Sequence, residues 1–387
     1  MSVLPVYDTD TAEIARRLDR LPDVVAELAA AAAQHDLDGS YPIEGIAAVH
    51  RAGLLTATVA TRYGGPGAGV SDAVTILREL GRGDPSVALI VALTLITHGV
   101  QARSGRWPDP LYRRLLDAVD DRPPLVNELR VEPELGTPSR GGLPATVARR
   151  TEAGWLLSGR KIYSTGSDGL RWMLVFAATE DGETGTFVVD GDSPGISIER
   201  TWDHLGLRAS ASHDVIFADT PVPADSVLEL GGASGSVRAS GHQVWNNLGL
   251  AALYLGVAGA ARDWFLTFLK ERVPGSLGKP LATLPRFHAV VGEIEAGLLG
   301  ADELLTSLAA RADAGEELAP SRVGAAKLVA NHAAIEAVER AVAAIGNPAL
   351  TRHNPLQRHL RDVLCARVHF PQDDVILSML GRETLGQ

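Results

Sequence analysis

The fold is decided by the stretch Trp155-Leu-Leu-Ser-Gly-Arg-Lys-Ile-Tyr-Ser-Thr-Gly-Ser167, which continues after two residues as Leu170-Arg-Trp-Met-Leu-Val-Phe-Ala-Ala178. Branched and aromatic residues predict β-strands at 155–157 and 171–178, and the glycines between them mark turns. Hydroxyl side chains gather beside a glycine in the connecting turn, at Tyr163, Ser164, Thr165 and Ser167. A flat cofactor could lie against such a turn. The alternative is an ordinary hairpin end.

On either side of this stretch, the residue pattern of the chain changes from helical to strand-like and back to helical. Residues 9–120 carry apolar residues at helical spacing, and residues 125–230 alternate short strand patterns with Gly, Pro, Asp and Ser. Four long helical patterns follow, over 244–273, 285–312, 321–345 and 356–385. The sequence therefore predicts an α+β protein with a helical domain at 1–122, a β domain at 123–232 and a helical bundle at 233–387.

Composition limits the possible functions. The 387 residues carry a net charge of −11, which argues against a nucleic acid or an anionic membrane as the main partner. The longest apolar run, Val87 to Ile96, is too short to span a bilayer. A single cysteine excludes an intrachain disulfide, and residues 1–10 lack the charge pattern of a signal peptide, so we expect a cytoplasmic location. No histidine or cysteine spacing predicts a metal site.

Five segments carry a resemblance to a known family. They are Val131-Glu-Pro-Glu-Leu-Gly-Thr137, Lys161-Ile-Tyr-Ser-Thr165, Leu205-Gly-Leu-Arg-Ala-Ser210 with Val215-Ile-Phe-Ala-Asp-Thr-Pro-Val-Pro223, Glu271-Arg272 and Gly381-Arg-Glu383. In order and spacing they resemble the motifs of the acyl-CoA dehydrogenase superfamily over nearly the whole chain. The resemblance implies an N-terminal helical domain, a middle β-barrel domain and a C-terminal four-helix bundle.

The resemblance also implies a flavin between the β domain and the bundle. The main chain at Val131 and Glu132 and the hydroxyl of Thr137 would face the flavin and its phosphates. Tyr163 would cover one face of the ring, with Ser164 beside it and Thr165 near N5.

Two further positions bear on the cofactor and on assembly. Arg272 would reach the diphosphate of a flavin in a neighbouring subunit of a dimer or tetramer, although a cation at a helix C-terminus is the plainer interpretation. Gly346-Asn347 is what remains of a family segment that grips the adenosine half of FAD. FAD is thus the expected cofactor, and FMN is the alternative.

The catalytic base of the family has no counterpart in this sequence. Dehydrogenases of the family use a carboxylate to take the α-proton of the substrate. Counting back from Gly381-Arg-Glu383 places Phe370 at that position, and the family's alternative position holds Asn246. Asp373 or Asp374 could substitute, although both fit a helix N-cap better. Trp245, Asn246 and Phe370 are the expected lining of the substrate pocket.

The sequence also resembles a second group within that superfamily, in which the base is absent. Flavin monooxygenases of the dibenzothiophene monooxygenase and nitrososynthase type use reduced flavin and O2 and lack the carboxylate. His98, Asn127 and His369 fall where residues of those enzymes face the flavin. As alternatives, His98 would cap a helix end and His369 would be a turn histidine.

Three functional hypotheses follow. The first is a flavin-dependent oxidoreductase that resembles acyl-CoA dehydrogenase, takes an acyl thioester or another small molecule, and passes electrons to an electron-transfer flavoprotein. The second is a two-component monooxygenase served by a flavin reductase. The third is a non-catalytic family member.

Overall fold

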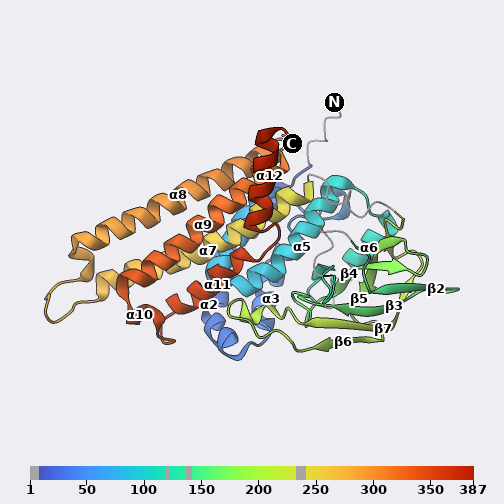
Figure 1. Ribbon diagram of the computed structural model, residues 1–387, viewed down its shortest axis with the longest axis horizontal. Helices are drawn as coiled ribbons and strands as arrows, with labels where there is room; N and C mark the ends of the chain where they lie inside the picture. The colour runs from blue at the N-terminus through green and yellow to red at the C-terminus, as the bar shows by residue number, and fades with distance from the viewer. Residues whose placement is uncertain (1–7, 118–121, 136–141, 232–240) are drawn as a thin grey trace.

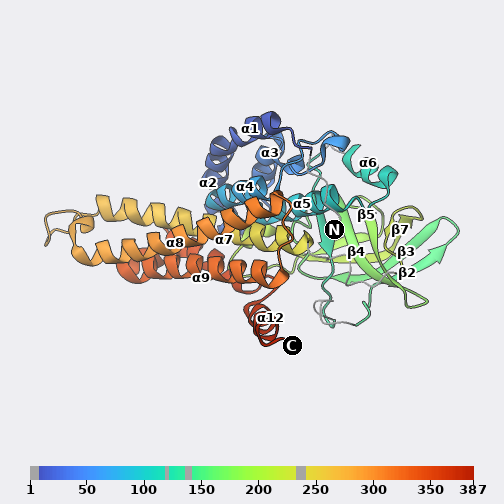
Figure 2. The ribbon, with the colours of Figure 1, turned by 90° about the horizontal axis from the view of Figure 1, so that it is seen from above.

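The computed structural model describes residues 8–117, 122–135, 142–231 and 241–387. Short helices and a β-sheet occupy one end of an elongated molecule, and three long helices extend to the other end (Figures 1 and 2). The predicted α+β class and the order helices, sheet, helices are confirmed.

The N-terminal part, as far as it is described, contains six α-helices, of which the fifth is the most buried. Asp84 accepts a hydrogen bond from the Ser86 amide (2.8 Å) and so caps the start of this helix, and its apolar surface is covered on nearly all sides. The helices are α1 (Thr11–Leu18), α2 (Leu21–Asp38), α3 (Ile43–Arg51), α4 (Val70–Gly83), α5 (Pro85–Ser104) and α6 (Asp109–Asp117).

Within its described residues, the middle part forms an eight-stranded sheet. Its order is β6-β7-β3-β2-β4-β5-β8, and β1 pairs in parallel with β4. Every residue of β4 is buried, which explains its continuous apolar sequence. The strands are β1 (Val126–Leu129), β2 (Val147–Thr151), β3 (Gly154–Lys161), β4 (Trp172–Thr179), β5 (Thr184–Asp190), β6 (Ile196–Glu199), β7 (Asp214–Pro223) and β8 (Val227–Leu228).

The C-terminal part is built on three long helices, α7 (Gly241–Glu271), α8 (Pro285–Asp313) and α9 (Pro320–Ile345), followed by the short α10 (Asn347–Leu350). The prediction of one helix over 356–385 is wrong. The chain forms α11 (Leu356–Leu364) and α12 (Asp373–Leu385), and the segment between them contains Pro371, which lacks an amide hydrogen and cannot continue a helix. Because this segment is not helical, the main-chain carbonyls of 369–371 can accept hydrogen bonds from neighbouring side chains.

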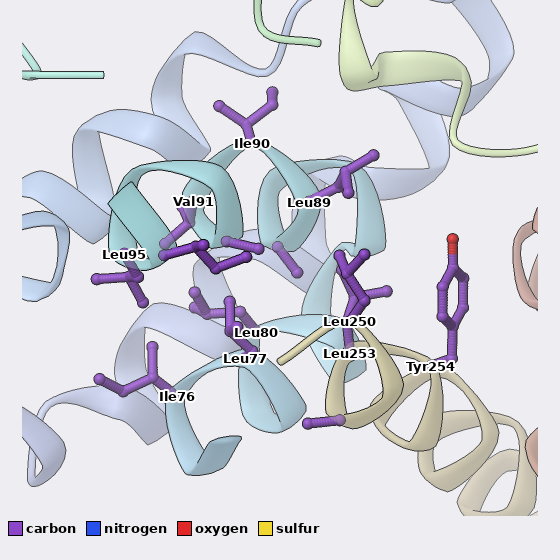
Figure 3. Packing of buried hydrophobic residues seen from close by; sticks show 14 of the residues in the cluster. Ile76, Leu77, Leu80, Leu89, Ile90, Val91, Leu95, Leu250, Leu253 and Tyr254 are labelled. Carbon is purple, nitrogen blue, oxygen red and sulfur yellow. The ribbon is translucent and has the colours of Figure 1, made fainter. Parts of the chain in front are cut away.

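Helices α4, α5 and α7 form the centre of the core. Ile76, Leu77 and Leu80 of α4 and Leu250 and Leu253 of α7 meet beneath a row of apolar residues on α5 (Figure 3). Two glycines let α4 and α7 approach closely: a Cβ on Gly256 would lie 2.1 Å from the Arg78 carbonyl oxygen, and one on Gly81 2.3 Å from that of Leu253.

The apolar character of α5 and α7 has a second consequence. Both helices are long and apolar enough to cross a membrane, contrary to the expectation from sequence that no segment is long enough. In the folded chain, 83% of the most apolar window of α5 and 89% of that of α7 are buried. Packing inside the protein therefore accounts for their composition.

Candidate flavin and substrate site

The turn that carries the predicted hydroxyl cluster follows β3 directly. Its main chain is held against residues 210–213: the Ser164 amide donates to the His213 carbonyl (3.1 Å), and the Gly166 amide donates to the Ser210 carbonyl (2.9 Å). Tyr163 adopts a left-handed conformation (φ 55°) that L-residues seldom use. The turn is thus fixed by a segment some 45 residues away, as the hydrogen bond from the Ser167 hydroxyl to the Ala211 carbonyl (2.7 Å) also shows.

A row of buried polar groups lies in this turn. The Asn127 side-chain amide donates to the Thr165 carbonyl (3.0 Å), and the Thr165 hydroxyl shares a hydrogen bond with Ser212 (2.8 Å). Ser212 in turn shares one with Ser210 (2.8 Å). The hydroxyl of Ser164 is buried and has no partner among the described residues. A buried hydroxyl without a partner calls for one, so this turn can accept a further polar ligand.

Tyr163 presents an aromatic surface beside the row. It is 56% exposed, and its ring stands edge-to-face with Trp202 (6.4 Å between centroids) and His204 (6.0 Å). Trp202 and His204 are stacked on each other at 3.6 Å. The aromatic pair supports Tyr163 and leaves ring surface open to solvent, where a flat ligand could stack.

Glu132 has a structural role that the sequence did not predict. Its carboxylate accepts from Lys161 Nζ (2.6 Å), the Thr146 hydroxyl (2.6 Å) and the Ala145 amide (2.6 Å), while the Val131 carbonyl accepts from the Ile162 amide (2.9 Å). Burial opposes its charge, but hydrogen bonds from Lys161 and Thr146 outweigh burial and hold the pKa of Glu132 below its usual value. The side chain of Glu132 is therefore committed to this pair.

A second group of hydrogen-bonded side chains lies between α7, α9 and the non-helical segment before α12. The Tyr254 hydroxyl shares a hydrogen bond with His369 Nδ1 (2.7 Å), and the Asn246 amide donates to the Phe370 carbonyl (3.1 Å). Lys327 Nζ donates to the carbonyls of His369 (2.6 Å) and Pro371 (2.7 Å). Burial and the charge of Lys327 lower the pKa of His369 to about 4, so its imidazole is neutral at pH 7.

Neither aspartate of α12 caps that helix. Gln372 is the N-cap residue, and Asp373 and Asp374 lie in the first turn, so the N-cap expectation is wrong. The Asp373 carboxylate shares a hydrogen bond with His332 Nε2 (2.7 Å) at the surface. The hydrogen-bond partner of Asp373 is thus His332 and not His369.

His98 forms a third group. The helix α5 continues six residues beyond it, so the alternative that His98 caps a helix end is wrong. It is fully buried, its Nδ1 shares a hydrogen bond with the Tyr112 hydroxyl (2.8 Å), and its Nε2 has no partner among the described residues. Burial lowers the pKa of His98 to about 4.

The structure thus joins Asn127 with Thr165, and His369 with Phe370 and Asn246, whereas within the described part of the chain no hydrogen bond links His98 to either group. Trp245 packs on Gly99, where a Cβ would lie 2.6 Å from its ring. Arg272 and Gly346 are exposed, and they directly follow the C-terminal ends of α7 and α9. Thr137 lies outside the described residues.

Sequence reasoning missed Tyr254 and Lys327 as members of these groups. Lys327 carried a signal, because it is a single lysine on a helix face of small residues in Gly324-Ala-Ala-Lys-Leu-Val-Ala330. A lysine on such a face is buried when the helix packs. Over the described ranges, no three His, Cys, Asp or Glu side chains are grouped to hold a metal ion.

The buried histidines predict a loss of stability in acid. Burial lowers the pKa of His98 and His369 to about 4 and that of His359 to about 3. Between about pH 6.5 and pH 4 the unfolded chain therefore binds protons that the folded protein excludes. Stability is full above about pH 6.5 and is lost as the pH falls, by about 1.4 kcal/mol per pH unit for each histidine.

The titration of Asp362 changes the stability with pH in the opposite direction, and a variant at this position therefore provides the control. Burial raises its pKa to about 7, so the folded protein keeps a proton that the unfolded chain releases above about pH 4. Asp362→Asn removes this compensation and should steepen the fall of the urea midpoint between about pH 7 and pH 4.5. A flat profile in the parent protein would contradict the assignment of neutral buried histidines.

The domain architecture and the comparisons with known proteins agree. Family models match in order: "Acyl-CoA dehydrogenase, N-terminal domain" at 19–107, "middle domain" at 131–220 and "C-terminal domain" at 248–373. YdbM of Bacillus subtilis (strain 168), described as a putative acyl-CoA dehydrogenase, is 33% identical over 369 residues, covering 95% of this chain and 96% of YdbM. The chain belongs to the acyl-CoA dehydrogenase superfamily and is a flavin-dependent oxidoreductase of that class.

Two further proteins are also similar over most of their length. L-evernosamine nitrososynthase of Micromonospora sp. is 30% identical over 366 residues, covering 89% of this chain and 84% of that enzyme. The structure of KijD3 with FMN and dTDP-3-amino-2,3,6-trideoxy-4-keto-3-methyl-D-glucose superposes with a TM-score of 0.84 at 27% identity, covering 100% of this chain and 97% of KijD3. Similarity alone therefore does not decide between dehydrogenation and oxygenation.

Proposed function

We propose that this protein is a flavin-dependent monooxygenase that receives reduced flavin from a separate reductase and uses O2. One observation carries the proposal: His369 and Phe370, where the resemblance would place the family's catalytic base, are not carboxylates and are held by Tyr254 and Asn246. Removal of an α-proton needs a base at the substrate. A neutral imidazole in a fixed orientation is better suited to hydrogen bonding with a polar group than to the proton abstraction that a carboxylate performs in the dehydrogenases.

The turn at 163–167 suits the flavin. Tyr163 offers a ring for stacking, and the buried hydroxyl of Ser164 and the hydroxyl pair Thr165–Ser212 offer hydrogen bonds. Asn127 keeps the Thr165 main chain in place. Bound reduced flavin would supply the electrons for O2, and these side chains would bind and orient it.

FMN is the proposed cofactor. The segment at Gly346-Asn347 lacks most of what grips the adenosine half of FAD in the resembling family, and KijD3 binds FMN. We further propose a homo-oligomer in which the exposed C-terminal ends of α7 and α9, marked by Arg272 and Gly346, face a neighbouring subunit. A cytoplasmic location remains part of the proposal.

The test is oxygen-dependent product formation. Purified protein receives FMN, NADH, a flavin reductase and 18O2, with indole, dibenzothiophene and a dTDP-amino sugar as probes. We expect one probe to gain an 18O atom, detected by mass spectrometry, with none gained when the protein is omitted. Absence of labelled product from every probe would count against the proposal.

Dehydrogenation is the second candidate, favoured by the 33% identity to YdbM. Its test is anaerobic: butyryl-CoA and longer acyl-CoA thioesters are added to the oxidised holoenzyme, and loss of the visible flavin absorbance is followed. Bleaching would mean that a base exists outside the His369 segment. Failure to bind FMN or FAD at all would support the hypothesis of a non-catalytic family member.

A further inference from the structure

Lys327 is a buried cation with an unusual set of partners. It is 1% exposed on α9, and its Nζ donates to two carbonyl oxygens, those of His369 and Pro371. No described carboxylate lies within ion-pair distance, and Asp373 of α12 acts on it from further away. Burying an ammonium group without a counter-charge costs free energy, and this burial lowers the pKa of Lys327 to about 8.

The same segment is held from the opposite side by α7. Asn246 donates to the Phe370 carbonyl, which lies between the two carbonyls bound by Lys327. Tyr254 fixes the His369 ring through Nδ1. Three successive carbonyls and one imidazole are therefore immobilised by two helices, in the stretch that separates α11 from α12.

A neutral donor could satisfy the same carbonyls at a lower cost of burial, so the charge itself calls for an explanation. The ammonium group lies 2.6 Å from the His369 carbonyl, and its charge adds to burial in lowering the pKa of His369. A positive charge beside a histidine disfavours the imidazolium form. The lysine thus acts on both the geometry and the protonation state of its neighbour.

We propose that Lys327 is a positioning residue for His369 and Phe370, fixing the main chain of 369–371 and placing a positive charge beside His369. Its importance for catalysis rests on the proposed function, in which the His369 imidazole would hydrogen-bond to a polar group of the ligand. The titratable groups around the pair are Asp373 on the α12 side and Tyr254 on the α7 side, the latter close to Cys365 and Asp362.

The test measures His369 directly. Full-length protein labelled with 13C-histidine is titrated by NMR, and the His369 signal is assigned by its loss in His369→Gln. In the parent, His369 should stay neutral down to about pH 4. In Lys327→Met, which removes charge and donors at similar volume, we expect the midpoint to rise by about one pH unit or more. Lys270→Met, the same change at an exposed lysine, should leave it unchanged.

Folding is checked by thermal unfolding, and Lys327→Gln, which keeps an amide donor without the charge, replaces the methionine variant if that fails to fold. Unchanged titration of His369 in a folded Lys327 variant would overturn the proposal. With FMN, reductase and the productive probe, kcat should fall about 100-fold with little change in KM, as for a misplaced group. If no probe reacts in the parent, the proposed function fails, while the titration still decides the role of Lys327.

Discussion

Lys161→Met should destabilise the protein by about 3–5 kcal/mol, because it leaves the Glu132 carboxylate buried without its counter-charge. Lys161 and Glu132 are 0% and 2% exposed, and Lys161 Nζ also donates to the Phe176 carbonyl (2.6 Å). Methionine nearly matches the volume of lysine, so the loss reports the charge and the hydrogen bonds rather than a cavity. The urea midpoint of the transition seen by tryptophan fluorescence is the measurement.

Two further variants separate charge from packing. In the double variant Lys161→Met/Glu132→Gln neither member of the pair is charged, and we expect it to recover part of the loss because an uncompensated charge costs more than a missing pair. Lys279→Met changes an exposed lysine and should stay within about 0.5 kcal/mol of the parent. A loss below about 1 kcal/mol for Lys161→Met would mean that the carboxylate finds another partner or becomes protonated.

The elements with local patterns were predictable. The bounds of α8 and α9 differ by one residue from the apolar patterns at 285–312 and 321–345, because the spacing of apolar residues in a helix can be recognised from the local sequence alone. Strand β1 was missed because Val126-Asn-Glu-Leu129 is short and polar at its centre, and it is a strand through its parallel pairing with β4. The break at 365–372 was missed although Pro371 marks it.

The site was predictable only in part, because its contacts join distant segments. The hydroxyl cluster at 163–167 was visible in the sequence, whereas its partners Ser210 and Ser212 come from a loop that no local pattern ties to it. Glu132 was noticed for its motif, but its buried pairing with Lys161 depends on how β3 lies beside the preceding loop. Lys327 and His369 are 42 residues apart and meet only through the packing of α9.

The second prediction with a large expected effect concerns the close crossing of α4 and α7 in the core. Gly256→Ala should destabilise the protein by about 3 kcal/mol, because the new Cβ would meet the main chain of α4, at 2.1 Å from the Arg78 carbonyl oxygen and 3.0 Å from the Arg82 nitrogen. Main-chain atoms cannot rotate away as a side chain can, so α4 and α7 must separate. Separation would loosen the contacts of Leu77, Leu80 and Leu253 shown in Figure 3.

Intrinsic helix propensity opposes this loss of stability and suggests a matched control variant. Alanine is favoured over glycine inside a helix by up to about 1 kcal/mol, so a glycine with open space around it should respond with the opposite sign. A Cβ on Gly300 of α8 would meet no neighbouring atom within 4 Å, and Gly300→Ala should raise the free energy of unfolding by about 0.5–1 kcal/mol. Urea midpoints of the two variants, measured together, therefore move apart. If both variants gain stability, the steric cost at α4 is smaller than the gain in propensity, and glycine at 256 is not what allows the two helices to pack.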